Sequence, residues 1–95
     1  TGDLKIDAHV NLVVQSGDAA ADGNSAHIYA KDESSSAEVF VRDEAGNVTK
    51  ISPHNTEGDW EYYSKNVKTG KVVRVNMEKM IRKLEEFTGE TFIEQ

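Results

Sequence analysis

Residues 4–15 alternate between apolar and polar side chains, in the order LKIDAHVNLVVQ. One face would carry Leu4, Ile6, Ala8, Val10, Leu12 and Val14, and only Val13 breaks the polar pattern of the other face. A period of two residues over this length is typical of a strand with one buried face. We therefore predict an N-terminal strand over residues 4–15 that packs on a core or a partner through Leu4, Ile6, Val10, Leu12 and Val14.

A stretch rich in turn-forming residues, 16–26, follows, and residues 27–51 then predict a meander of short strands. The strands are expected at residues 27–31, 38–42 and 48–51. A polar loop over residues 32–37 would join the first two, and a hairpin turn with Gly46 at a positive φ would join the second and third. Pro53 ends the meander because proline cannot donate to a ladder.

The meander contains a short repeat, because IYAKDE at residues 28–33 returns as VFVRDE at residues 39–44. A unit of six strand-like residues is too small to form a core alone, and two copies are too few for a solenoid. Two explanations are open. The copies are neighbouring strands of an ordinary sheet, or the chain is one third of a threefold assembly in which partner chains complete the core.

The last third of the chain predicts a hairpin over residues 59–75 and then a helix over residues 77–88. Asn76 is a favourable N-cap and Gly89 a favourable residue after the last turn. The helix carries an apolar stripe of Met77, Met80, Ile81, Leu84 and Phe87. An isolated helix of about twelve residues is marginal in water, so this one must pack on the hairpin or on copies of itself. The fold class expected is α+β, mainly β, in a single module over residues 1–95.

Composition favours assembly over a self-sufficient core. The 95 residues include ten valines but only three leucines, and a small domain with so thin a core is usually reinforced by disulfides, metals or oligomerisation. Cysteine is absent, which excludes disulfides and thiolate metal sites. The net charge of -6 disfavours a nucleic-acid-binding surface, and the sequence contains no apolar run long enough to predict a membrane span.

The run HIYAKDESSSAEVFVRDEAGNVTKISPHN, residues 27–55, resembles segments of phage tail-fibre-like proteins and of environmental viral sequences. In those proteins an LYAKD…ELFV.DEAGN…SPHN pattern precedes a hairpin rich in Trp and Tyr and a terminal helix. The resemblance extends over residues 26–95 and does not include residues 4–15. It implies a virion-associated structural module, homotrimeric and near the C-terminal end of a fibre. It implies no catalytic motif and no cofactor.

Candidate chemistry is sparse. The histidines at positions 9, 27 and 54 are too scattered for a local metal motif, although a trimer would bring three copies of His9 or of His54 together at its axis. The cluster of Asp18, Asp22 and Asn24 lacks the spacing of a calcium loop, so a solvated loop is expected there. No catalytic, metal or cofactor site is predicted, and the chain is not expected to be an enzyme.

One aromatic group, Trp60, Tyr62 and Tyr63, can be core or binding surface. Alternation places Trp60 and Tyr62 on one face, where we expect them to cover the helix stripe. Tyr63 lies on the opposite face and is the candidate for an exposed surface that binds a host receptor or a glycan.

The sequence is therefore compatible with three functions. The first is a homotrimeric assembly module of a viral fibre, located in the virion or another extracellular appendage, with intertwined strands and a helical bundle at one end. The second is a receptor- or glycan-binding tip displayed by that oligomer. The third is a monomeric soluble α+β domain of another role. The helix stripe does not specify whether two or three chains associate.

Overall fold

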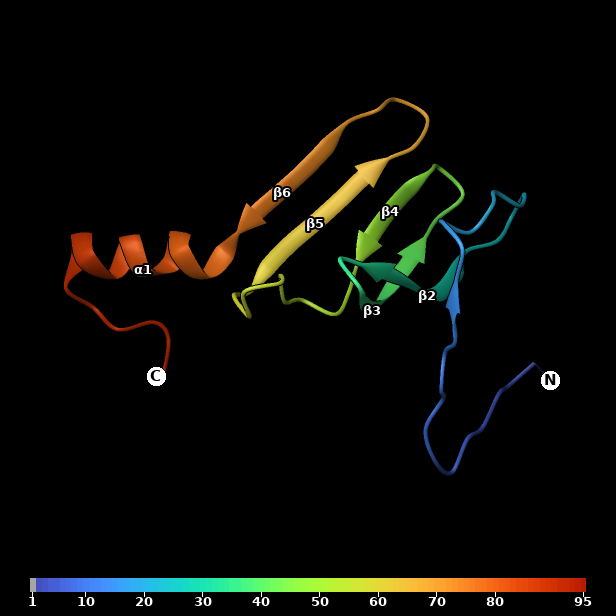
Figure 1. Cartoon of the computed structure of the whole chain (residues 1–95), viewed down its shortest axis with the longest axis horizontal. Coiled ribbons are helices and arrows are strands. Elements are labelled where there is room, and N and C mark those ends of the chain that lie inside the picture. Colours follow the sequence, from blue (N-terminus) through green and yellow to red (C-terminus); the bar gives the residue numbers. More distant parts are fainter. Residues whose placement is uncertain (1) are drawn as a thin grey trace.

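The computed structural model describes residues 2–95 as one six-stranded sheet followed by one helix (Figure 1). The strands lie side by side in chain order: β1 (Val14–Gln15), β2 (His27–Glu33), β3 (Ser36–Arg42), β4 (Asn47–Lys50), β5 (Glu61–Asn66) and β6 (Val72–Asn76). All neighbours are antiparallel except β1 and β2, which are parallel. With α1 (Met77–Thr88) the fold is α+β and mainly β, as the sequence predicts.

The repeated unit forms two neighbouring strands of one sheet. β2 and β3 run antiparallel with Tyr29 directly opposite Phe40, and the two rings stack with centroids 5.9 Å apart. The loop between them is shorter than predicted, because only Ser34 and Ser35 lie outside the ladder. Both serines have a positive φ, 53° and 67°, as a tight two-residue hairpin turn requires.

The prediction of a strand over residues 4–15 is wrong, because only Val14 and Gln15 form one. The register limits how far it could run. Val14 pairs with Ala30 in the parallel direction, so Asn11 would be level with His27, the first residue of β2, and residues before Asn11 have no neighbouring strand. The chain before Val14 leaves the sheet as a mostly exposed segment that bends at Asp7 and Ala8 (Figure 1).

The helix occupies the predicted residues 77–88. Its N-cap Asn76 accepts a hydrogen bond from the Lys79 N–H, and Gly89 ends it in the left-handed conformation with φ 73°. The carbonyl of Trp60 accepts bonds from the N–H groups of Met77 and Glu78, which fixes the first turn to the start of β5. Beyond that turn α1 projects away from the sheet (Figure 1), and none of its residues is buried. No helix in residues 2–95 has the length and apolar character to cross a membrane.

The covered interior of the chain is small. Among residues 2–95 only four hydrophobic residues are buried, namely Tyr29, Ala30, Phe40 and Val48, whereas sixteen large hydrophobic residues are exposed. The radius of gyration is 16.5 Å, and a compact chain of this length is expected near 12 Å, roughly. The accessible surface is 7128 Å², against about 5,400 Å² for a folded monomer of this mass. A single chain is therefore extended and exposes more surface than a globular domain.

Candidate functional site

The sheet has two unlike faces. Residues paired across the ladder share a face, so the register assigns every strand residue to one side. The charged face carries Lys31, Glu33, Glu38, Arg42, Lys50, Glu61, Lys65 and Arg74 around Tyr29, Phe40, Val48 and Tyr63. The apolar face carries Ile28, Ala30, Val39, Val41, Thr49, Tyr62, Ser64, Val73 and Val75.

Asp18 fastens the turn-rich stretch onto the charged face. Its Oδ1 accepts hydrogen bonds from the Tyr29 hydroxyl at 3.0 Å and from Lys31 Nζ at 2.7 Å, and its Oδ2 lies 2.9 Å from Lys65 Nζ. One residue along, the Ala19 carbonyl accepts from Arg42 Nη1 at 2.7 Å. Three strands, β2, β3 and β5, are thereby linked through two residues of a loop. The expectation that Asp18 is part of a solvated loop is wrong, because its side chain is only 16% exposed.

The contacts of Asp18 shift two pKa values. Burial acts to raise the pKa of Asp18, but the hydrogen bonds from Lys31, Lys65 and Tyr29 outweigh it and lower the pKa to about 2. Burial, and then the bond to the Asp18 carboxylate, raise the pKa of Tyr29 to about 12. Asp18 is therefore ionised and Tyr29 protonated across the physiological range.

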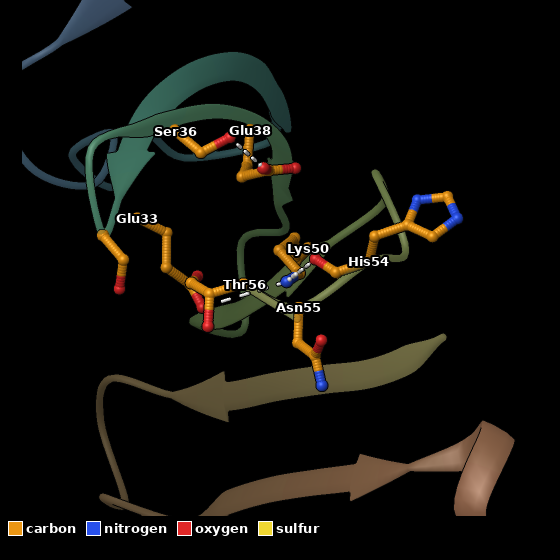
Figure 2. A pocket seen from close by; sticks show the side chains of 8 residues that line it. Glu33, Ser36, Glu38, Lys50, His54, Asn55 and Thr56 are labelled. Carbon is orange, nitrogen blue, oxygen red and sulfur yellow. Dashed lines mark hydrogen bonds and ion pairs between the residues drawn. The ribbon is translucent and has the colours of Figure 1, made fainter. Parts of the chain in front are cut away.

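A second ionic cluster surrounds Lys50, whose side chain is 1% exposed (Figure 2). Its Nζ donates to Glu61 Oε2 at 2.9 Å and to the His54 carbonyl at 2.8 Å, and it lies 3.8 Å from Glu33 Oε1. Arg74 Nη1 binds the same two carboxylates, at 2.7 Å from Glu61 and 3.1 Å from Glu33. Burial acts to raise the pKa of Glu61, but the bonds from Lys50 and Arg74 outweigh it and lower that pKa. Two cations thus balance two carboxylates.

The hollow beside Lys50 is a structural feature of the sheet rather than a ligand pocket. It measures about 200 Å³ and lies between the β2–β3 turn and residues 54–56. Pockets for small molecules usually exceed about 300 Å³ and are mainly apolar. Its ionic groups are engaged with one another, since Glu38 accepts from Ser36 and Ser52, and Glu33 from Arg74. Figure 2 shows the imidazole of His54 turned away from Lys50. The arrangement holds strands together and offers no poised acid or base.

The histidines are not brought together within one chain. His9 and His54 are exposed and His27 is half-buried. In residues 2–95, no three His, Cys, Asp or Glu side chains lie close enough to hold a metal ion. A metal at a symmetry axis, with His9 or His54 from each chain, stays a prediction that depends on assembly.

Most of the predicted contact residues are uncovered in the single chain. The N-terminal group is solvent-exposed, with Leu4 84% and Val10 60% exposed, apart from Leu12, which is half-buried. On α1, Met77 and Ile81 are half-buried, whereas Met80, Leu84 and Phe87 are 51%, 47% and 89% exposed. Much of the apolar stripe of the helix and of the N-terminal segment is therefore exposed, and on the apolar face of the sheet Ile28 and Tyr62 are 59% and 46% exposed.

The assignment of the aromatic group is reversed. Tyr63 lies on the charged face, packs against the buried core and is covered by the Arg74 guanidinium 4.1 Å from its ring centroid. Trp60 and Tyr62 are instead 55% and 46% exposed. Tyr62 and Tyr63 do lie on opposite faces, but local alternation does not reveal which face another segment covers. Here the turn-rich stretch covers the face that carries Tyr63.

Lys50 and Glu61 belong to no motif predicted from the sequence, and Asp18 is predicted there only as part of a solvated loop. The sequence nevertheless contains a pattern that indicates buried ionic contacts around these residues. Four strands carry an aromatic or apolar residue two positions before a cation on the same face: Tyr29 and Lys31, Phe40 and Arg42, Val48 and Lys50, Tyr63 and Lys65. A cation at the same inward position in each strand indicates carboxylates that face it, and the repeat is part of this pattern.

Compared with protein-family models, with curated proteins and with solved structures, the chain matches none.

Proposed function

We propose that this chain is a self-assembly module, one subunit of a homotrimer that forms part of a viral fibre or a similar appendage. Uncovered apolar surface carries the proposal. Apart from Asp32, the charged residues of the strands lie on the inner face and the outer face carries uncharged side chains. This is the reverse of the arrangement expected for a solitary domain. The viral setting rests on the resemblance of residues 27–55 to tail-fibre-like sequences.

The amount of excess surface supports more than one interface per chain. The accessible area of 7128 Å² exceeds the expectation for a monomer by about 1,700 Å². A standard protein interface buries about 800 Å² per partner, so the excess corresponds to two such patches. Each subunit of a ring of three uses two different patches, whereas a twofold dimer uses one. One large twofold contact would bury a similar area per chain. The choice of three chains therefore rests on the resemblance of residues 27–55 to tail-fibre-like sequences.

The proposal assigns no chemistry to the module. The buried ionic groups hold the sheet together, and the exposed stripe of α1 supplies the contact that joins chains. Met80, Leu84 and Phe87 lie on this stripe, at spacings typical of helices that pack lengthwise on one another.

The test is the mass in solution, by light scattering behind a sizing column, of the natural chain and of two variants. We expect a mass of three chains for the natural protein and of one chain for Leu84→Asp, because an unpaired charge in a symmetric contact is costly. Lys83→Asp is the matched control, since Lys83 is 73% exposed on the polar side of the same turn, and it should keep the full mass.

A natural mass of one chain would overturn self-assembly, and a mass of two chains would overturn the trimer. A full-size assembly of Leu84→Asp would exclude the helix stripe from the contact. Far-UV circular dichroism of each variant shows whether the sheet is kept.

A further inference from the structure

We infer that the N-terminal segment, defined as residues 4–12, adds as a strand to the free edge of β6 in a second copy of the chain. The inference rests on the proposed self-assembly and specifies which parts of two copies meet. It joins two features that lack partners within one chain.

The first feature is the edge of β6. β6 is the last strand of the sheet, and β5 is its one neighbour within residues 2–95. The Asn66 N–H donates to the Lys71 carbonyl at 2.8 Å, so in an antiparallel ladder the backbone groups of Val72 and Arg74 point away from β5. Such an edge is a template for another strand, and neither proline nor a bulge protects this one.

The second feature is the segment itself. Its residues alternate between apolar and polar, as those of a strand do. Most of the segment lies beyond the first residue of β2, and it has no strand partner within residues 2–95. Figure 1 shows it leaving the sheet at β1, on the side of the molecule opposite β6. A second copy can supply the missing edge without moving any strand of the first, and the segment straightens at its bend over Asp7 and Ala8 to pair along it.

The two features are complementary in polarity and charge. If Leu4, Ile6, Val10 and Leu12 join the apolar face, they extend the surface that Val73 and Val75 begin. The polar side of the segment then lies beside Val72, Arg74 and Asn76. Asp7, at the centre of the segment, would lie opposite Arg74. The contacts of Arg74 with Glu33 and Glu61 both use Nη1, and its side chain is 46% exposed, so a further carboxylate has access to the guanidinium.

The chain contains no cysteine, which makes disulfide trapping unambiguous. The first variant is Asp7→Cys with Arg74→Cys, oxidised after assembly and run on denaturing gels without reductant. A ring in which each segment reaches the next β6 gives a covalent product of three chains, whereas a chain with a single cysteine gives at most two. The matched control is Asp7→Cys with Asp32→Cys. It places the second thiol at an exposed position of β2, away from the β6 edge, and should give no three-chain product.

Because Arg74 also binds Glu61, a second set of variants leaves it in place. Val72→Cys is combined with His9→Cys for antiparallel addition or with Lys5→Cys for parallel addition, and we expect a three-chain product from one of the two. Intrachain disulfides, or no three-chain product from any pair, in a protein whose mass is still that of the oligomer would overturn strand addition and leave self-assembly standing. A natural mass of one chain would overturn both.

Discussion

Buried charge at single residues is compensated in this sheet by both carboxylates and aromatic rings. Lys31 Nζ lies 2.7 Å from the Asp18 carboxylate and 4.7 Å from the centre of the Phe40 ring. A buried ion pair adds little stability compared with a well-packed apolar pair, but removal of one partner leaves an uncompensated charge. Removal of one charged partner from these clusters should therefore lower the free energy of unfolding by more than the ion pair contributes to it.

Asp18→Asn tests this at the carboxylate that binds Tyr29, Lys31 and Lys65. The folded pKa of about 2 lies below the ordinary value of 3.8, so ionised Asp18 stabilises the fold above about pH 4, and this contribution is lost as the pH falls through about 2. We expect the variant to lose about 2 kcal/mol of unfolding free energy at pH 7. The loss should shrink between pH 4 and pH 2.

Urea unfolding at fixed protein concentration, from pH 7 down to pH 2, measures that difference. Asp32→Asn is the control, since Asp32 is an exposed carboxylate on β2, next to Lys31 in the chain, and it should change stability little at any pH. If the difference in unfolding free energy between Asp18→Asn and the natural chain stays constant from pH 7 to pH 2, the role assigned to the Asp18 carboxylate is contradicted.

At the scale of elements, the sequence predicts those features of helices and turns that depend only on residues close together in the chain. The capping of α1 by Asn76 and Gly89 and the turn at Gly46, with φ 93°, depend on residues within one turn of each other, and all three are found as expected. The N-terminal strand and the exposure of Tyr63 depend on distant segments. Alternation identifies a strand-like segment and its two faces, but a neighbouring edge must exist before the segment pairs, and a loop such as residues 16–22 decides which face is covered.

The turn between β2 and β3 offers a prediction at this scale. Ser35 has a φ of 67°, a conformation that glycine adopts without steric cost and other residues seldom do. We expect Ser35→Gly to raise the free energy of unfolding by about 0.5 to 1 kcal/mol, because it relieves that strain in a two-residue turn. Thermal unfolding should show a higher midpoint.

Ser36→Gly is the control for this change. Ser36 is the first residue of β3 and pairs with Glu33, so glycine there should lower the midpoint rather than raise it. Equal effects of the two substitutions would mean that backbone strain at Ser35 does not limit the stability of the hairpin.

At the scale of the whole molecule, the arrangement of side chains is consistent with a structure completed by other chains. The four buried hydrophobic residues form a small core for residues 2–95, and many of the exposed apolar side chains lie on the helix, on the outer face of the sheet and on the N-terminal segment. The sequence indicated the deficit through its few leucines. Which residues fill a symmetric contact could not be read from one chain, because the register between copies is set by surfaces that no local pattern describes.

If most apolar burial occurs between chains, folding and association are one equilibrium, and the midpoint of thermal unfolding must depend on protein concentration. We expect the midpoint to rise steadily over a hundredfold increase in concentration. The same increase should leave Leu84→Asp, which lacks the helical contact, at one low midpoint. Differential scanning calorimetry or circular dichroism at several concentrations measures this. A midpoint of the natural chain that is independent of concentration, combined with a mass of one chain, would mean that the exposed apolar residues contribute nothing to folding and that the inner ionic clusters and the Tyr29–Phe40 stack alone hold the sheet.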